Sequence, residues 1–427
     1  MNESLNRNNL LSLVSMMLII SGFLFIIVNN LPYGLGSNRF LWSPLWLLGI
    51  LLMKPKVYTY KLVLFVLFYG VVFVFLLPNT LWRYTNDFYI ASILNEFYSI
   101  IVAITVVAYF LLTKDYKTWG LIGVVGFISV IITASMTLIA TQFFPSIVRA
   151  SVSENFTYTS DYSFFSQIGA GGYGFAQSLV VLVPIIVFFI KNETKSKTKK
   201  VVFFIILSLV FITIVRMQLF ANILVSLIIL TVAFLGNHKQ KSSLVLIIGS
   251  LLFLTMVSTT YISAVVKEVS LNFEPESEMY LKLNDLSILI ESSSLDDEGS
   301  ITSRAERYPQ LWETFIDNPL DGSASNPNHN SRSMHSGGHL YWMSRLTLWG
   351  LPMFLVFLFI LYKLFYHVGS VLTSDYRFYF HLSVLSIILL GFMKNIGGRE
   401  VVYTLFLIIP GLYFYIKNVY SIKNKLK

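Results

Sequence analysis

The sequence predicts an all-α polytopic membrane protein with about twelve transmembrane helices and a large extracytoplasmic loop between the ninth and the tenth. Of its 427 residues, 55% are hydrophobic and 12% are charged, whereas soluble domains carry about 25% charged residues. Apolar runs long enough to cross ~30 Å of hydrocarbon recur along the chain. Basic residues gather in alternate loops, as the positive-inside rule requires of cytoplasmic loops.

The apolar runs divide the chain into spans and loops. The first run lacks a small-residue cleavage site before Asn29, so we expect a retained span and not a removed leader. The stretch 201–235 is too long for one crossing, and we expect a tight hairpin near Arg216 to divide it. The candidate spans are about 10–28, 40–53, 62–77, 89–112, 119–139, 172–190, 201–215, 218–235, 243–261, 340–362, 378–393 and 401–416.

Three regions follow from these spans. Residues 1–261 hold the first nine spans and an outer loop at about 140–171. Residues 262–339 form the large extracytoplasmic loop, and residues 340–427 hold the last three spans and a cytoplasmic tail. Nineteen of the 31 Lys and Arg residues, but only four of the 22 acids, fall in the loops assigned to the cytoplasm. Both termini are therefore expected to be cytoplasmic. Because topology accounts for the net charge of +9, we expect no nucleic-acid partner.

The kind of base differs between the two sides of the membrane. Nine of the eleven arginines, but only three of the twenty lysines, fall on the predicted outer side. Arginine binds phosphate and carboxylate through two parallel hydrogen bonds, so the outer face is expected to bind an anionic ligand. The alternative is that individual arginines snorkel to the surface or pair with outer acids.

The composition also limits cofactors. The chain has no cysteine, which excludes disulfides and thiolate metal sites. It has no HExxH motif, Walker loop or Gly-x-Ser-x-Gly motif. A metal held by His329, His335 and His339 is disfavoured by the arginines interleaved with the histidines of this part of the chain, such as Arg332, so we expect no metal and no cofactor.

A polar stretch at 301–350 concentrates candidate functional residues, with three histidines and four arginines. Within it, Thr302-Ser303 and Glu306 form a capping-box pattern that predicts a helix start. Pro309 predicts a kink or the true start, and Asn318-Pro319 predicts the end. The pattern favours an amphipathic helix on the outer membrane surface or one packed within the loop. Its apolar face consists of Tyr308, Leu311, Trp312 and Phe315.

Two further groups stand at the predicted outer ends of spans. Arg216 is a charge between two apolar runs, and it is expected to begin the eighth span at the positive end of the helix dipole. The dipole would not explain such a charge, which favours a functional role. Gly171 and Gly172 precede the sixth span, where glycines and a helix N-terminus suit an anion. A flexible joint is the alternative for the glycines.

His339 begins the tenth span, and an imidazole there can accept a proton from a hydroxyl near neutral pH. A polar end-group is the alternative use of this side chain. Arg345 follows six residues later.

The order of these residues matches a pattern. Arg304, Trp312 and Phe315 are followed by Asn318-Pro319-Leu320-Asp321-Gly322, a loop containing His and Asn, and a span opening His339-x10-Gly350. This pattern resembles the O-antigen polymerase and ligase superfamily of bacterial envelope polysaccharide enzymes. Members of that superfamily similarly carry an Arg–Trp helix, an N-P-L-x-G turn and a His eleven residues before a Gly.

The match has one departure. The polar residue that the superfamily places after its His is Leu340 here, while a His-Asn pair occurs earlier, at His329-Asn330. The spacing to Gly350 favours His339 as the equivalent residue.

The resemblance implies a glycosyltransferase of lipopolysaccharide-type polysaccharide biosynthesis, acting on the outer leaflet of the bacterial plasma (inner) membrane. The donor would be an oligosaccharide on undecaprenyl diphosphate, and the acceptor a hydroxyl of another lipid-linked repeat. Membrane lipid and a chain-length regulator protein are further expected partners. His339 would activate the acceptor, while Arg216 and Arg304 would stabilise the departing diphosphate. The residues expected to bind substrate are Arg149, Arg307, His329, Arg332, His335, Arg345, Gly171 and Gly172.

Two alternatives stay open at this point. A ligase would transfer the finished glycan to lipid A core, and the sequence does not separate it from a polymerase. A twelve-span flippase for lipid-linked sugars belongs to another class. The halves of the chain show no self-similarity and its charges lie at the predicted outer rim, both of which disfavour a transporter.

Overall fold

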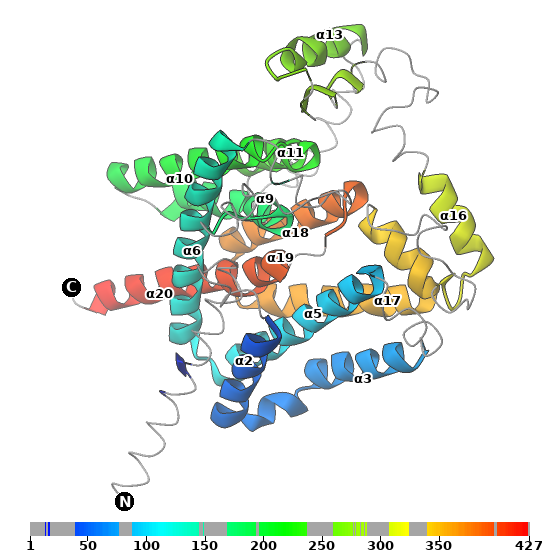
Figure 1. Ribbon diagram of the computed structural model, residues 1–427. Helices are drawn as coiled ribbons and strands as arrows, with labels where there is room; N and C mark the ends of the chain where they lie inside the picture. Colours follow the sequence, from blue (N-terminus) through cyan, green and yellow to red (C-terminus); the bar gives the residue numbers. More distant parts are fainter. Residues whose placement is uncertain are drawn as a thin grey trace, which may run out of the picture.

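The computed structural model describes residues 39–76, 88–144, 169–193, 196–236, 259–275, 307–323, 340–396 and 399–425, with a few isolated positions elsewhere. Within these ranges every regular element is a helix. The elements, labelled as in Figure 1, are α2 (Arg39–Met53), η1 (Pro55–Thr59), α3 (Lys61–Leu76), α5 (Phe88–Thr113), α6 (Tyr116–Phe143), α9 (Tyr173–Phe188), η2 (Phe189–Glu193), α10 (Lys197–Arg216), α11 (Phe220–Leu235), α13 (Thr259–Ser270), α16 (Arg307–Asp317), α17 (Tyr341–Ser370), α18 (Ser374–Met393), α19 (Arg399–Tyr403), η4 (Thr404–Ile408) and α20 (Ile409–Lys425).

Six helical segments among the described residues are long and apolar enough to cross a membrane. This confirms the coarse prediction of an all-α membrane protein, while the count of about twelve spans stays a prediction. The predicted spans at about 10–28 and 243–261 lie almost entirely outside the described residues. The six segments are Tyr116–Phe143, Tyr173–Asn192, Lys197–Arg216, Tyr341–Ser370, Ser374–Met393 and Arg399–Lys417.

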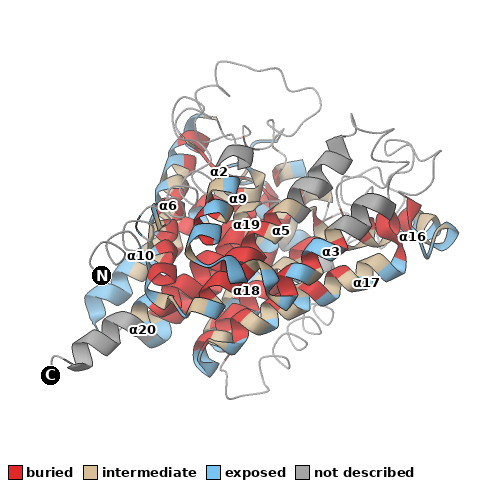
Figure 2. Ribbon diagram, turned by 90° about the horizontal axis from the view of Figure 1, so that it is seen from below, coloured by how far each residue is buried: buried red, intermediate tan, exposed pale blue. Residues whose placement is uncertain are grey.

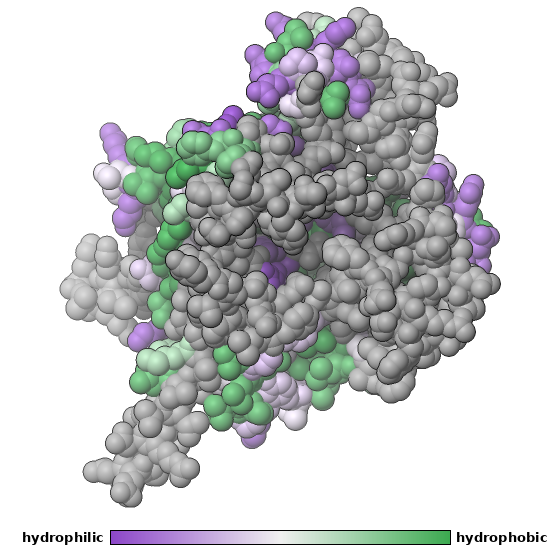
Figure 3. Space-filling model, in the orientation of Figure 1, coloured by the Kyte–Doolittle hydropathy of each residue, from purple (hydrophilic) through white to green (hydrophobic). Residues whose placement is uncertain are grey.

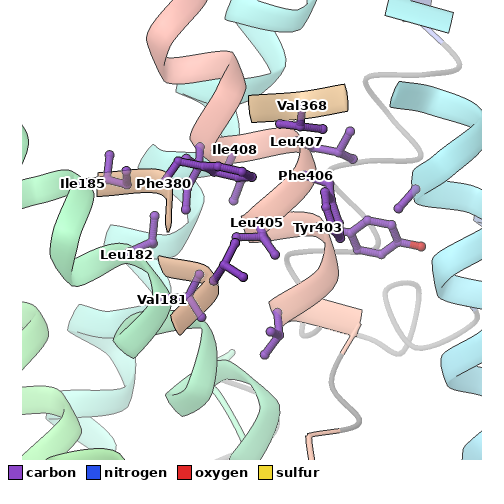
Figure 4. Packing of buried hydrophobic residues seen from close by; sticks show 14 of the residues in the cluster. Val181, Leu182, Ile185, Val368, Phe380, Tyr403, Leu405, Phe406, Leu407 and Ile408 are labelled. Atoms are coloured by element: carbon purple, nitrogen blue, oxygen red, sulfur yellow. The ribbon is translucent and has the colours of Figure 1, made fainter. Parts of the chain in front are cut away.

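Helix α9 lies at the centre of the bundle. Every residue from Phe175 to Phe188 is buried, and a helix that is apolar all round is stable only when other helices surround it. Its neighbours are α10, α11, α18 and α19, and Figure 2 shows buried residues gathered in the middle of the bundle. In Figure 4, Val181, Leu182 and Ile185 of α9 lie near Phe380 of α18 and the η4 segment.

Helices α6 and α20 make the most extensive pairing, and they approach through glycines. A Cβ added to Gly411 would lie 2.6 Å from the Cα of Gly123, and one added to Gly120 would lie 2.9 Å from the backbone N of Tyr415. Small residues allow helix backbones to pack this closely, which is how helices associate where lipid gives no hydrophobic drive. Larger side chains at these positions would separate the two helices.

Helix α17 consists of two helices joined by a sharp kink. Gly350 has φ 70° and ψ 169°, far from helical values. Glycine adopts a positive φ without the steric penalty of a Cβ. The kink leaves the Leu351 N–H without its helical acceptor, and it donates instead to the Pro319 carbonyl at 2.8 Å. The expected span at 340–362 is therefore broken in its first half.

The Asn318–Gly322 turn packs directly on this kink. Gly322 also has a positive φ of 73°, and a Cβ there would lie 2.5 Å from the backbone N of Gly350. A Cβ on Gly350 would in turn lie 2.8 Å from the backbone N of Gly322. The N-P-L-x-G turn and the glycine of the following span are thus two halves of one backbone contact. This close contact explains why glycine, which has no Cβ, stands at both positions.

Helix α16 ends at Asp317, as Asn318-Pro319 predicts, and Pro309 lies within its first turn. The capping-box residues lie outside the described part of the chain. Leu311 is buried, and its carbonyl accepts a hydrogen bond from Thr347 Oγ1 at 3.2 Å. The Tyr308 hydroxyl donates to the Phe392 carbonyl, and burial raises the pKa of Tyr308. Helix α16 therefore packs on α17 and α18.

Two apolar side chains of α16 are exposed. Trp312 and Ile316 are 50% and 56% exposed and lie four residues apart on one face of the helix, and Leu320, in the turn that follows, is 70% exposed. One face of α16 therefore packs on α17 and α18, and the predicted contact of the helix with the outer membrane surface stays a prediction. In Figure 3, hydrophilic side chains gather over α13 and α16, while apolar side chains cover much of the visible surface of α6, α10 and α11.

Candidate functional site

The starts of α9, α17 and α19 meet the ends of α6 and α18 at one end of the bundle. The Gly171 N–H donates to Thr137 Oγ1 of α6 at 2.7 Å. The Tyr341 N–H of α17 donates to the Lys394 carbonyl at the end of α18, at 3.3 Å. Polar residues from four separate stretches of the chain are therefore brought together here.

Arg345 is fully enclosed at this end. Its side chain is 0% exposed, and its guanidinium carbon lies 4.4 Å from the centre of the Tyr341 ring and 5.9 Å from that of Trp349. Cation–π contacts offset part of the cost of burying this charge. A charge kept inside an apolar bundle marks a functional candidate, and the predicted substrate-binding role of Arg345 stays a prediction.

Lys394 is a second buried cation, and we did not single it out from the sequence. It is 3% exposed, and its ammonium nitrogen lies 5.0 Å from the centre of the Tyr173 ring at the start of α9. The start of α17 contacts both residues, because the Tyr341 ring lies beneath the Arg345 guanidinium and the Tyr341 backbone N–H donates to the Lys394 backbone carbonyl. One feature of the sequence could have indicated it, since Lys394 is one of only three lysines on the predicted outer side.

Buried amide groups lie beside Lys394. Gln177, one turn after Tyr173 on α9, is 0% exposed and donates from Nε2 to the Asn395 carbonyl at 2.8 Å. Within the described residues, neither Gln177 Oε1 nor Asn395 Oδ1 has a hydrogen-bond partner. An unsatisfied buried acceptor costs free energy, so a ligand hydroxyl that donated to either oxygen would be stabilised.

The two predicted glycines differ in their surroundings. Gly172 is exposed and caps the start of α9, and a Cβ there would have no neighbour within 4 Å. Gly171 is buried against Phe175, whose side chain a Cβ would contact. Only Gly172 thus leaves open space at the helix N-terminus, where an anion is favoured.

The prediction that Arg216 begins the eighth span is wrong. Arg216 is the last residue of α10, not the first of the next helix, and a cation at a helix C-terminus interacts favourably with the dipole. Its Nη2 also donates to the Thr141 carbonyl at 3.1 Å, in the last turn of α6. The predicted hairpin between α10 and α11 is present, with Gln218 at φ 55°. Arg216 therefore caps two helix ends, which is a structural reason for its charge.

A pocket with a cavity volume of about 60 Å³ is lined in part by Tyr341, whose ring also contacts the Arg345 guanidinium. Its wall is almost entirely apolar, with Arg399 and Ser99 among its few polar residues. Arg399 is paired with Glu400, with Nε to Oε1 at 3.5 Å. The lining residues are Ser99, Ile100, Tyr341, Trp342, Leu361, Phe365, Ile387, Ile388, Ile396, Arg399, Val401, Val402, Leu405 and Phe406.

The remaining predicted site residues cannot be placed in this arrangement. Arg307 begins α16, but its side chain lies outside the described part of the structure. No cluster of three or more His, Asp or Glu side chains suited to a metal occurs among the described residues. The predicted residues that lie wholly outside the described ranges are Arg149, Arg304, His329, Arg332, His335 and His339.

The fold and site define an all-α membrane-type protein with buried cations and an apolar pocket at one end of its helix bundle. No model of a known protein family matches the chain, and no curated protein matches it.

Proposed function

We propose that this protein is a glycosyltransferase that joins undecaprenyl-diphosphate-linked repeat units into a surface polysaccharide on the outer leaflet of the bacterial plasma membrane. In this proposal the chain has about twelve spans, both termini are cytoplasmic, and the site formed by Arg345 and Lys394 faces outward. The observation that carries it is the burial of two cations, Arg345 near the start of α17 and Lys394 at the end of α18, where the Tyr341 N–H joins these two helices by a backbone hydrogen bond. Buried cations suit a ligand that is both anionic and attached to a lipid.

The chemistry follows from the leaving group. The acceptor hydroxyl oxygen forms a bond to the anomeric carbon of the donor sugar. The bond from that carbon to the diphosphate oxygen breaks, and its electron pair stays on the diphosphate. Arg345 and Lys394 stabilise the charge that develops there, as preorganised cations in a site of low dielectric do. These cations and Arg304 supply the positive charge without a metal ion.

The hydroxyl proton passes to a base, for which His339 is the candidate. Gln177 and Asn395 offer acceptor oxygens to the hydroxyls of a bound sugar. Arg216 holds helix ends near this site, and we assign it a positioning role.

The test is extension of a defined lipid-linked repeat by the purified protein in lipid nanodiscs, with product length read as a ladder on a gel. Extension is expected with lipid-linked repeats alone and in the presence of EDTA. Arg345→Gln and Lys394→Gln should each abolish the ladder, whereas Lys199→Gln, an exposed cation on α10, should not.

Two outcomes would replace the proposal. Transfer only when lipid A core is supplied would make the protein a ligase. Movement of a single repeat across the bilayer without extension would make it a flippase.

A further inference from the structure

Helix α16 and the turn after it present an exposed surface at the edge of the bundle, outside α17 (Figure 1). On the helix, the exposed acids Glu313 and Asp317 directly follow the exposed apolar residues Trp312 and Ile316. An apolar pair and an acidic pair therefore lie side by side. An apolar residue and an acid follow in the turn, and both are exposed as well. We call this the α16 surface, and its members are Trp312, Glu313, Ile316, Asp317, Leu320 and Asp321.

The negative charge of the α16 surface is not balanced locally. Residues 308–321 contain three acids and no lysine or arginine. Within the described part of the chain, Glu313 and Asp317 make no ion pair. Carboxylates spaced four residues apart on a helix repel each other, so a cationic partner would relieve this repulsion.

The exposed faces of the long apolar helices differ from the α16 surface. Ile132 of α6, Phe204 of α10 and Leu355 of α17 are 54%, 56% and 53% exposed, and none of these three helices contains an acid. Such faces suit hydrocarbon, in which a charge is costly. Exposed apolar patches bordered by polar residues mark sites of interaction with membranes or proteins. A bilayer would cover the apolar side chains of the α16 surface but leave its acids uncompensated, which favours a protein.

The α16 surface is held in place by the contacts of the opposite face of the helix. Leu311 is buried, and its carbonyl accepts a hydrogen bond from Thr347 Oγ1. The turn is fixed in the same way, because the Leu351 N–H donates to the Pro319 carbonyl. A surface that is already ordered loses little conformational freedom when a partner binds, so more of the contact energy is retained as affinity.

We propose that the α16 surface binds an amphipathic helix of a partner protein, which carries lysine or arginine at helical spacing beside a row of apolar side chains. The bases pair with Glu313 and Asp317, and the apolar row packs on Trp312 and Ile316. Amphipathic helices are commonly recognised in this way, and complementary charges set the register. A second copy docked through the same surface would bring acids against acids. In the purified protein, where no partner is present, the apolar side chains are left to the bilayer. The proposal does not depend on the proposed enzymatic activity.

The experiment places the photoreactive residue p-benzoylphenylalanine at Ile316 of the full-length protein in its native cells. After irradiation, mass spectrometry identifies the attached molecule. The expected adduct is a peptide of a second protein with lysine or arginine at helical spacing beside apolar residues. The same residue placed at Ile132, which is similarly exposed on α6, should attach to lipid and not to that protein. Adducts at Ile316 of lipid alone, of this same chain or of a segment without such bases would overturn the proposal.

A matched pair of double variants tests the acids. Glu313→Lys with Asp317→Lys should reduce the yield of the adduct about tenfold, because two attractive contacts become repulsive. Glu268→Lys with Glu274→Lys makes the same change of charge at two exposed acids in and after α13, and it should leave the yield unchanged. Size-exclusion profiles and thermal unfolding confirm that both double variants are folded. Equal yields from the two would contradict the proposal.

Exchange of the charges completes the test. Replacing the crosslinked bases of the partner by glutamate should restore the adduct with the variant that carries Glu313→Lys and Asp317→Lys. Failure of this exchange, with both proteins folded, would show that the acids do not pair with those bases and would reject the assigned contact.

Discussion

The contact between the Asn318–Gly322 turn and the kink of α17 predicts that Gly350→Ala severely destabilises the protein. The φ of 70° and ψ of 169° at Gly350 lie in a region that is essentially restricted to glycine, and they cost a residue with a Cβ about 1–3 kcal/mol. The new Cβ would also lie 2.8 Å from the Gly322 N and closer still to the Leu320 carbonyl. Both neighbours are backbone atoms, so relief requires moving the turn, and overpacking of this kind costs a further ~1–3 kcal/mol. Together the loss of stability is about 2–6 kcal/mol.

The assay is thermal unfolding of the purified protein in one detergent, followed by tryptophan fluorescence. The shift in Tm caused by each kcal/mol of destabilisation becomes smaller as chains become longer. We therefore expect Gly350→Ala to lower Tm by about 3–8 °C. Gly369→Ala is the matched control in the same helix. Its Cβ would have no neighbour closer than 3.7 Å, and alanine favours a helix over glycine by about 1 kcal/mol. Its Tm should therefore be unchanged or slightly higher.

The double variant tests whether the two glycines share one contact. Gly322→Ala should destabilise by a similar amount, because its Cβ would lie 2.5 Å from the Gly350 N. Either substitution alone already separates the turn from the kink. The free energy of unfolding of the double variant should therefore fall by less than the sum of the decreases in the two single variants. Equal Tm values for Gly350→Ala and Gly369→Ala would refute the reasoning.

Three further predictions follow from the described contacts. Arg345→Lys keeps the charge but loses the planar guanidinium over Tyr341, and we expect glycan extension to fall about 10²–10³-fold while Tm changes little; extension at the normal rate would contradict the role given to this residue. Gly123→Leu should separate α6 from α20 and lower Tm by several degrees, whereas Ile132→Leu on an exposed face of α6 should not. Replacing Trp312 and Ile316 together by Ser should lower the total quenching of tryptophan fluorescence by brominated lipid, while the quenching of the remaining tryptophans falls less. The reason is that the exposed face of α16 is expected to contact the bilayer. Unchanged total quenching would count against that contact.

The helices were largely predictable from the sequence because each rests on a local pattern. The bounds of the apolar runs predicted the ends of α6, α9, α10 and α18 to within a few residues, and Asn318-Pro319 predicted the end of α16. The kink at Gly350 was not predicted, although the glycine was part of the matched pattern. A positive φ depends on the turn that packs against it from thirty residues away, and no local pattern records such a contact.

The site was predictable only in part, for the same reason. Arg345 was named from its place in a polar stretch, but nothing local indicates that its guanidinium is enclosed by Tyr341 and Trp349. Lys394 was counted only as a topological charge, because its burial depends on how the end of α18 meets the starts of α9 and α17.

The comparison of Arg216 with Arg345 shows why the position of a charge within a helix matters more than its presence in an apolar run. Arg216 ends α10 and donates to a carbonyl in the last turn of α6, so both helix C-termini favour its charge. Arg345 lies in the second turn of α17, near the positive end of that helix, where the dipole disfavours a cation. The unfavourable place in a helix dipole that we predicted for Arg216 is therefore found at Arg345. An anion bound at this end would interact favourably with both the helix N-terminus and the guanidinium.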